Sequence, residues 1–259
     1  MIFSDDELER YARQIVLPAI GGQGQQRLKM ANVCVVGAGG IGCAVIPALA
    51  GAGVGRLTVI DGDVVALSNL HRQPMFRGDQ IGQAKAECAA AFVAGLNPHV
   101  AVRVVGERID PANAAAVLAG HDLIVDGTDN FATRLLVGDT AVALGIPLVS
   151  AAAAQFQGQL GLFRARPCYR CFVGDAFDAD DCDNCAELGV LGALTGVVGN
   201  AAALLAIRVL ARVGEEPIGR VDVFDGVSGE WRRMRLVADP GCRVCGFLPS
   251  PGFPGEVAA

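Results

Sequence analysis

A glycine-rich run and two cysteine pairs have the residue types and spacing to do chemistry in this chain. The run reads Gly37-Ala38-Gly39-Gly40-Ile41-Gly42, and the Cys-x-x-Cys pairs are Cys168/Cys171 and Cys242/Cys245. The glycine spacing indicates that a phosphate approaches the backbone, and paired cysteines indicate a metal site or a redox couple. Each signal alone is weak, but together they predict an ATP-using enzyme with a structural zinc.

The glycine run has the G-x-G-x-x-G spacing of a loop between a strand and a helix, where backbone amides and the helix dipole receive phosphate. Asp61 closes the next strand about 20 residues later, where a carboxylate can accept hydrogen bonds from ribose hydroxyls. These residues alone fit NAD as well as ATP, and on their own they favour a dinucleotide-dependent dehydrogenase.

The segment after Asp61 changes this balance because it adds cations. It reads Ser68-Asn69-Leu70-His71-Arg72-Gln73, and Lys85 follows it. Arg72 offers a planar fork and Lys85 a point charge, and both stabilise charge that grows on departing pyrophosphate. The plainer alternative is that both are surface charges. Their position after the glycine run favours a triphosphate.

A carboxylate follows the apolar run Leu123 to Val125, in the sequence Thr128-Asp129-Asn130. This places it at the carboxyl edge, where open α/β sheets bind ligands. Asp129 is the predicted magnesium ligand, since Mg²⁺ commonly takes one or two carboxylates and completes its shell with phosphate and water. The alternative is that Asp129 caps the helix that begins near Asn130, and both roles can hold together.

Short apolar runs alternate with helical stretches, which indicates parallel βαβ units. We therefore expect an α/β fold with a doubly wound, mostly parallel sheet, N-terminal helices and a zinc-tied C-terminal region. A hairpin signal at Gly226 to Gly229 predicts an antiparallel C-terminal part. The expected strands are Val33 to Val36, Leu57 to Ile60, Val100 to Val105, Leu123 to Val125, Pro147 to Ser150, Gln159 to Ala165, Arg220 to Phe224 and Trp231 to Val237.

Two local features of the first 50 residues carry their own expectations. A helix is predicted over Asp5 to Val16, followed by a break at Gly21-Gly22-Gln23-Gly24. Pro47 falls about one turn into the helix after Gly42, where an interior proline predicts a kink and puts the packing of that helix in question.

Composition excludes several classes of function. The net charge of -6 argues against a nucleic-acid-binding surface. The acidic start, Met1 to Glu7, is unlike a signal peptide, so we expect a cytoplasmic protein. The apolar stretch Leu188 to Ile207 approaches the roughly 20 residues of a membrane span. It is rich in glycine and alanine and contains Thr195 and Asn200, so a buried helix is the better interpretation.

Together with Arg10-Tyr11-Ala12-Arg13-Gln14 and Asp61-Gly62-Asp63, these motifs resemble the ThiF/MoeB/HesA family, the bacterial relatives of ubiquitin-activating enzymes. The resemblance covers nearly the whole chain, from Arg10 to Cys245. It implies an enzyme that adenylates the C-terminal Gly-Gly carboxylate of a ubiquitin-like sulfur carrier of the ThiS or MoaD type. ATP and magnesium would be used and pyrophosphate released, for thiamine, molybdopterin or another thio-cofactor.

The resemblance also assigns roles to residues. Arg13 would reach a neighbouring subunit's site, which implies a homodimer, and Cys185 matches the position of a reactive cysteine. The catalytic set is then Arg13, Arg72, Lys85, Asp129 and Cys185, with zinc on Cys168, Cys171, Cys242 and Cys245. The expected nucleotide-binding set is Gly37, Gly39, Gly40, Asp61, Asp63, Ser68, Asn69, Leu70, His71, Arg72, Gln73, Lys85, Asp129 and Asn130.

The resemblance further implies one adenylation domain over residues 1–259. It would comprise a helical segment at 1–30, a nucleotide-binding half at 31–165, and a zinc-binding and carrier-binding half at 166–248 with an exposed loop at 174–189. A separate sulfur donor is expected, because little chain follows Cys245.

The remaining cysteines differ in what they predict. Cys34, Cys43 and Cys88 fall in strand or helix patterns and are most simply small buried hydrophobes. Cys182 forms a third pair with Cys185, which could be competing ligands, a reversible disulfide, or one reactive thiol and a bystander. Nearby aspartates should raise the pKa of a thiol there and slow it.

Two other classes of function stay open at this point. One is an NAD-dependent oxidoreductase with a structural zinc, which the cations and Asp129 disfavour. The other is a non-catalytic binding relative, which the same residues argue against.

Overall fold

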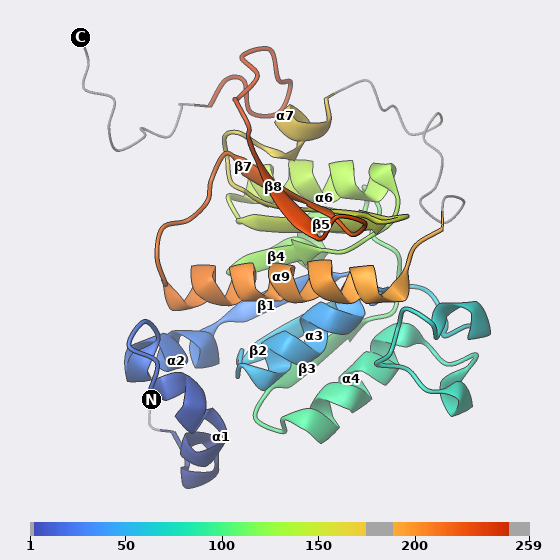
Figure 1. Cartoon of the computed structure of the whole chain (residues 1–259), viewed down its shortest axis with the longest axis vertical. Helices are drawn as coiled ribbons and strands as arrows, with labels where there is room; N and C mark the ends of the chain where they lie inside the picture. Colours follow the sequence, from blue (N-terminus) through green and yellow to red (C-terminus); the bar gives the residue numbers. More distant parts are fainter. Residues whose placement is uncertain (1–2, 175–188, 249–259) are drawn as a thin grey trace.

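An eight-stranded sheet divides the molecule into two helical layers, as Figure 1 shows for this computed structural model. The structure describes residues 3–174 and 189–248. The strand order is β3-β2-β1-β4-β5-β6-β7-β8. The strands are β1 (Asn32–Val36), β2 (Arg56–Ile60), β3 (Ala101–Val105), β4 (Leu123–Asp126), β5 (Leu148–Ala154), β6 (Gln157–Phe163), β7 (Arg220–Asp225) and β8 (Glu230–Arg235).

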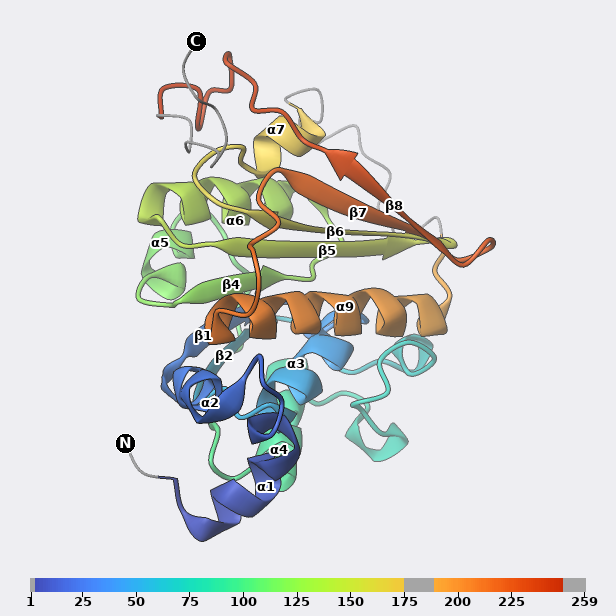
Figure 2. The same ribbon diagram turned by 60° about the vertical axis from the view of Figure 1, so that its left-hand side comes forward.

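Helices cover both faces of this sheet. One face carries α3 (Gly42–Gly51), α4 (Lys85–Leu96) and the long helix α9 (Gly192–Ala211), and the other carries α5 (Ala114–Leu118), α6 (Phe131–Leu144) and α7 (Tyr169–Val173) (Figures 1 and 2). Each layer buries its own cluster of aliphatic side chains against the strands. The predicted doubly wound fold is confirmed.

The first five strands are parallel because helices connect them. β1 pairs with β2 on one side and β4 on the other, with Val33 opposite both Leu57 and Leu123. All four residues of β4 are buried, as expected for a parallel strand covered on both faces. Burying both faces removes the period-two alternation, so these strands are recognisable in the sequence as continuous apolar runs.

From β5 onward the pairing is antiparallel, which confirms the predicted C-terminal part. β5 pairs with β6, β6 with β7, and β7 with β8. β5 extends to Ala154, four residues beyond the predicted end at Ser150. The extra residues are Ala151 to Ala154, and alanine favours helices in isolation. They form a strand because they pair with β6, and this pairing overrides the local preference of alanine for helix.

The long helix α9 lies across the sheet face and against α3, as both views show. It confirms the buried helix predicted at Leu188 to Ile207, with its start shifted to Gly192. Within the described ranges it is the one helix long and apolar enough to cross a membrane by length and composition. Gly199 allows α9 and α3 to approach closely, because a Cβ there would lie 2.7 Å from the Cβ of Ala44.

The N-terminal helices correct one prediction. α1 (Asp5–Ile15) begins at a capping box in which Glu7 N donates to Ser4 Oγ and Ser4 N donates to Glu7 Oε2. The predicted break at residues 21–24 is wrong, because α2 (Gly21–Met30) starts there. Gly24 faces Ala211 of α9, where a Cβ would lie 3.7 Å from the alanine Cβ. Gly24 therefore lies inside the helix and does not end it.

Pro47 lies inside α3, which continues through it to Gly51. The apolar face of the helix, including Ile46 and Leu49, is fully buried. The packing of α3 against the sheet, which Pro47 put in question, is therefore intact. The kink at Pro47 stays a prediction.

Replacing Gly199 with alanine should destabilise the fold, whereas the same change at Gly196 should stabilise it. A Cβ at Gly199 would also lie 2.8 Å from the carbonyl oxygen of Ile41, while nothing lies within 4 Å of a Cβ at Gly196. We expect Gly199→Ala to lower the free energy of unfolding by about 1–3 kcal/mol through overpacking. Gly196→Ala should raise it by up to about 1 kcal/mol through helix propensity. Urea unfolding measures both, and equal effects would contradict the packing argument.

Candidate nucleotide site and cysteine centre

The predicted site residues meet where the strand order of the sheet reverses. The chain proceeds from β1 to β2 and β3 on one side, and then returns to place β4 on the other side of β1. The loops after β1 and β4 therefore leave neighbouring strand ends in opposite directions. Open α/β sheets bind ligands in the crevice that forms between two such loops. Gly37 follows β1, Asp61 follows β2 and Thr128 follows β4.

The glycine loop is shaped by contacts that exclude side chains. Gly37 adopts φ +91°, and a Cβ there would lie 3.3 Å from the backbone of Gly127. A Cβ at Gly42 would collide with the carbonyl oxygen of Gly37. α3 begins at Gly42 with no side-chain cap on its first turn. The amides of Cys43, Ala44 and Val45 already donate to the carbonyls of Gly39 and Ile41. An anion such as phosphate would therefore be met by the amides of residues 39–42 and by the dipole of the helix.

Asp61 fastens the glycine loop to the end of β2. Its Oδ2 accepts a hydrogen bond from Ala38 N at 2.7 Å, and its Oδ1 accepts one from Asp63 N at 2.8 Å. Burial raises the pKa of Asp61, and the two backbone hydrogen bonds and the charge of Lys85 oppose that rise. The carboxylate lies where a ribose would follow the phosphate loop.

Lys85 begins α4 and is held by Asp63 through two contacts. Its backbone N donates to the Asp63 carbonyl at 2.9 Å, and its Nζ lies 3.3 Å from Asp63 Oδ2. The Lys85 side chain is only 7% exposed, so it is not a surface charge. Arg108 donates to Asp63 Oδ1 at 2.9 Å. Burial opposes ionisation of Asp63, but Arg108 and Lys85 outweigh it and lower its pKa.

Arg108 was not predicted from the sequence. It lies in the loop after β3, and no motif there distinguishes it from other surface arginines. Only the parallel pairing of β2 with β3 brings that loop beside Asp63.

The segment Ser68 to Gln73 folds into a tight turn that presents Arg72. Asn69 O accepts hydrogen bonds from the backbone amides of Arg72 and Gln73, each at 3.0 Å. Arg72 Nη1 donates to Ser68 O at 3.0 Å and contacts His71 Nε2 at 2.8 Å. That contact requires an imidazole nitrogen that accepts, because a guanidinium only donates.

The start of α9 supports this turn from the other half of the chain. Gly192 lies against the carbonyl oxygen of His71, and Thr195 Oγ1 lies 3.5 Å from Arg72 O. Thr195 also lies against Gly40, where an added Cβ would be 2.9 Å from its methyl group. Helix α9 thus contacts both the glycine loop and the Arg72 turn.

The loop after β4 presents Asp129 to solvent. Asn130 caps α6 by accepting a hydrogen bond from Thr133 N at 2.8 Å. The alternative in which Asp129 caps this helix is therefore wrong. The Asp129 side chain is exposed, and it makes no hydrogen bond or ion pair within residues 3–174 and 189–248. An exposed carboxylate at the carboxyl edge can accept a cation.

The loop also rests on residues that sequence reasoning missed. Asp126 and Arg134 are 1% and 4% exposed. Burial raises the pKa of Asp126, against the charge of Arg134 and hydrogen bonds from Thr128. The sequence signal for them was weak, because one ends a strand and the other falls in the first turn of a helix.

Arg13 lies far from the nucleotide loops of its own chain. It is on α1, whose Arg10 donates to the carbonyl of Leu96 at 2.9 Å. Leu96 ends α4 and Lys85 begins it, so about 18 Å of helix separates the two ends. The same chain cannot place Arg13 beside Lys85 in this arrangement.

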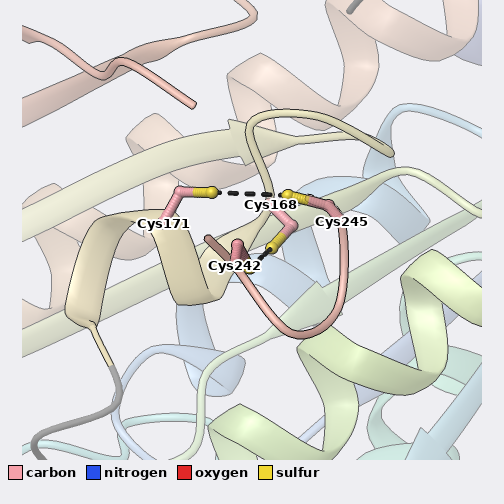
Figure 3. Close-up of side chains that lie close together, drawn as sticks. All are labelled: Cys168, Cys171, Cys242 and Cys245. Carbon is pink, nitrogen blue, oxygen red and sulfur yellow. Dashed lines mark hydrogen bonds between the residues drawn. The ribbon is translucent and has the colours of Figure 1, made fainter. Parts of the chain in front are cut away.

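The four predicted metal ligands meet in one cluster, shown in Figure 3. Cys168 and Cys171 are at the start of α7, and Cys242 and Cys245 are on a C-terminal loop. The Sγ atoms of Cys168 and Cys242 lie 3.7 Å apart and those of Cys171 and Cys245 lie 3.4 Å apart. All four sulfurs lie within 4.8 Å of one another.

These distances fit a tetrahedral metal site rather than disulfides. A disulfide needs sulfurs about 2.05 Å apart, whereas zinc–sulfur bonds of about 2.3 Å set sulfurs about 3.8 Å apart. Burial raises the pKa of Cys168, while backbone hydrogen bonds from Cys245 and Val244 outweigh burial and lower that of Cys242. Asp239 N also lies 3.4 Å from Cys171 Sγ. The donor set is one that soft metals prefer.

Three cysteines have the buried positions expected of small hydrophobes, Cys34, Cys43 and Cys88. Cys182 and Cys185 lie outside the described residues, as does most of the predicted loop at 174–189.

The site so described defines a class of protein. It combines a doubly wound α/β fold, a glycine loop that leads into a helix with no side-chain cap, two cations and an exposed carboxylate with a four-cysteine cluster that could hold a metal ion. The chain belongs to the ThiF family, whose sequence model matches residues 11–244.

Several relatives are similar over nearly their whole length. The chain is 42% identical over 246 residues to the molybdopterin-synthase adenylyltransferase of Escherichia coli strain K12, covering 94% of this chain and 98% of that protein. It is 42% identical over 257 residues to the sulfur carrier protein adenylyltransferase of Thermus thermophilus, covering 96% and 95%. It is 44% identical over 241 residues to the SAMP-activating enzyme E1 of Haloferax volcanii, covering 93% and 89%.

Solved structures show the same fold. E. coli MccB superposes with a TM-score of 0.81 at 21% identity, covering 98% of this chain and 76% of that chain. The relatives confirm the predicted adenylyltransferase class, and they give no support to the NAD-dependent oxidoreductase alternative. The names of these relatives refer to molybdopterin synthase and to a sulfur carrier protein.

Cys34 and Cys43 should resist alkylation in the folded protein. Burial raises the pKa of each thiol to about 12. The reactive thiolate is therefore scarce at pH 8. We expect iodoacetamide to leave both unmodified until the protein is unfolded, as read by peptide mass spectrometry. Modification of either at the rate of an unfolded control would contradict this burial.

Proposed function

We propose that this protein adenylates the C-terminal Gly-Gly carboxylate of a ubiquitin-like sulfur carrier, using ATP and magnesium and releasing pyrophosphate. The observation that carries the proposal is the convergence of an uncapped phosphate loop, Arg72, Lys85 and the exposed Asp129 at one edge of the sheet. The names of the relatives support the carrier as substrate.

The chemistry needs no general base. A C-terminal carboxylate has a pKa of about 3.5 and is already an anionic nucleophile at neutral pH. Its oxygen forms a bond to the α-phosphorus of ATP while the bond from that phosphorus to the bridging oxygen breaks. The electron pair leaves with pyrophosphate, and the carrier becomes an acyl-adenylate. Catalysis then depends on orientation and on stabilising the charge that develops.

The residues of the site divide this work. The glycine loop and the start of α3 bind phosphate, and Asp61 binds the ribose. Lys85 and Arg72 stabilise the charge on the departing pyrophosphate. Lys85 is already oriented by Asp63, so little rearrangement is needed when the triphosphate arrives. Asp129 would hold magnesium, which would supply positive charge to offset the negative charge of the phosphates.

A second copy of the chain would complete the site. Arg13 is exposed and separated from Lys85 of its own chain by the length of α4. A homodimer in which each Arg13 enters the partner's site would add a cation beside the phosphates. A single well-placed arginine can be worth roughly 10³ to 10⁵ in the rate of phosphoryl transfer.

Zinc is the proposed occupant of the four-cysteine site. Four thiolates suit tetrahedral zinc, and the spacing of the sulfurs fits it. The site joins α7 to the C-terminal loop and so fixes two segments that are distant in sequence.

Later steps involve further partners. We propose that residues 1–259 act as one adenylation domain in the cytoplasm, where thiols stay reduced for metal binding. Sulfur would come from a separate donor protein, and Cys185 would accept the activated acyl group or transfer sulfur.

Replacing Cys185 with alanine should leave adenylation intact and abolish the later transfer. Full transfer by the Cys185→Ala variant would contradict the proposed role of Cys185.

Exchange of labelled pyrophosphate into ATP tests the adenylation. With magnesium and carriers ending in Gly-Gly, we expect exchange that requires the terminal glycine of the carrier. Lys85→Met should reduce exchange by about 10²-fold or more, because a buried cation that stabilises the leaving group is lost. Exchange without the terminal glycine would contradict this substrate.

The chain supplies a matched control, since Lys29 is its other lysine. Lys29 also pairs with a carboxylate, Glu7, at 2.7 Å, but it lies on α2. Lys29→Met should keep exchange near the wild-type rate. No exchange with any carrier, together with tight NAD binding, would overturn the proposed function.

Metal analysis tests the cysteine centre. We expect one zinc per chain, lost in Cys242→Ser, with a lower free energy of unfolding because the C-terminal loop is released. Unfolding in urea with and without a strong chelator measures that loss. Cys88→Ser, which alters a cysteine outside the cluster, should retain the metal. Equal metal content in both variants would exclude the site.

A further inference from the structure

The residues on both sides of Asp129 are held, although its own side chain is not. Asn130 is fixed as the cap of α6. Thr128 N and Thr128 Oγ1 both donate to Asp126 Oδ1, at 3.0 and 2.8 Å. Asp129 therefore projects from a loop whose backbone has little freedom.

Arg134 holds the remaining polar group of Thr128. Its Nε donates to the Thr128 carbonyl at 2.7 Å, and its Nη2 donates to the same oxygen. Arg134 extends from the first turn of α6 back toward the loop that precedes the helix. The backbone amide and the hydroxyl of Thr128 thus donate to Asp126, and its carbonyl accepts from Arg134.

This arrangement is costly for stability alone. Arg134 is 4% exposed and Asp126 is 1% exposed, and Asp126 Oδ2 has no hydrogen-bond partner in the described part of the chain. Burying charged groups costs several kcal/mol each unless they are well compensated. An apolar pair of similar volume would serve packing equally well or better. The burial of these two polar side chains is explained if they fix the position of the loop.

Thr128 also lies at the centre of the nucleotide site. Its Cγ2 would be 3.4 Å from a Cβ at Gly37, so the loop after β4 packs directly on the phosphate loop after β1. A shift of Thr128 would therefore change the distance between the phosphates and Asp129.

We propose that Arg134 is a positioning residue that fixes Asp129 relative to the phosphate loop through Thr128, with Asp126 as its counterpart on the same residue. This inference rests on the proposed magnesium role of Asp129. Residues that orient a metal ligand typically contribute 10- to 100-fold to metal affinity or activity.

Magnesium-dependent ATP binding, measured by calorimetry on the full-length protein, tests the proposal. Arg134→Met should raise the magnesium concentration for half-maximal ATP affinity by roughly 10- to 100-fold, while ATP binding in EDTA stays unchanged. Arg134→Lys should recover part of this shift, because an ammonium can donate to the carbonyl but lacks the fork. Arg27→Met is the matched control, since Arg27 bonds the Ala211 carbonyl at 3.0 Å, away from the loop.

Each outcome decides the proposal. A folded Arg134→Met with wild-type magnesium dependence overturns it, and so does an equal loss of ATP binding with and without magnesium. If Arg134→Met fails to fold, Arg134→Lys decides, and wild-type behaviour there also overturns it. Pyrophosphate exchange by the wild type separates the two ideas. If the wild type shows no pyrophosphate exchange but Arg134→Met shifts the magnesium dependence of ATP binding, the proposed substrate is rejected and the positioning role of Arg134 stands.

Discussion

The structure depends on the close approach of two backbone loops at the edge of the sheet where the strand order reverses. Gly37 and Gly127 meet with no room for a side chain, and Gly42 closes against the carbonyl of Gly37. This contact brings the start of α3 next to the loop that carries Asp129. A phosphate bound at the helix N-terminus, as proposed, would therefore lie beside the carboxylate. The parallel pairing of β1 with β4 places the ends of the two strands side by side. Thr195 of α9 packs against Gly40 of the glycine loop.

Charge in the site is arranged so that each cation already has a carboxylate or a carbonyl as partner. Lys85 and Arg108 share Asp63, and Arg72 bonds Ser68. Paired cations keep a defined geometry without ligand, and they avoid the cost of a buried charge with no partner. Asp129 differs because it is exposed and makes no bond in the described ranges. The site thus combines cations held in place with one carboxylate left open, which suits a ligand that brings both phosphate and a metal ion.

The second half of the chain contributes to this site without containing the phosphate motif. Helix α9 packs on α3 and begins against His71, so the segment between β6 and β7 supports the Arg72 turn. The cysteine cluster fastens α7 to the C-terminal loop on the other side of the sheet. Tyr169, the residue after Cys168, packs against Gly138 of α6, where an added Cβ would lie 3.0 Å from its own Cβ. The cysteine cluster is therefore in packing contact with the helix that carries Arg134.

Local patterns in the sequence were sufficient to predict the parallel strands, the glycine loop, the pairs of cysteines that cluster and the family. Apolar runs, glycine spacing and Cys-x-x-Cys pairs are all visible in neighbouring residues. They misjudged Gly21 to Gly24 and the length of β5, where contact with α9 and pairing with β6 override local propensity. They also missed Arg108, Asp126 and Arg134, which become neighbours of the site only when strands and loops far apart in sequence come together. The sequence by itself determined which chemistry is present. Only the tertiary structure decided which residues hold that chemistry in place, because positioning depends on burial and long-range hydrogen bonds that leave no periodic signal in the chain.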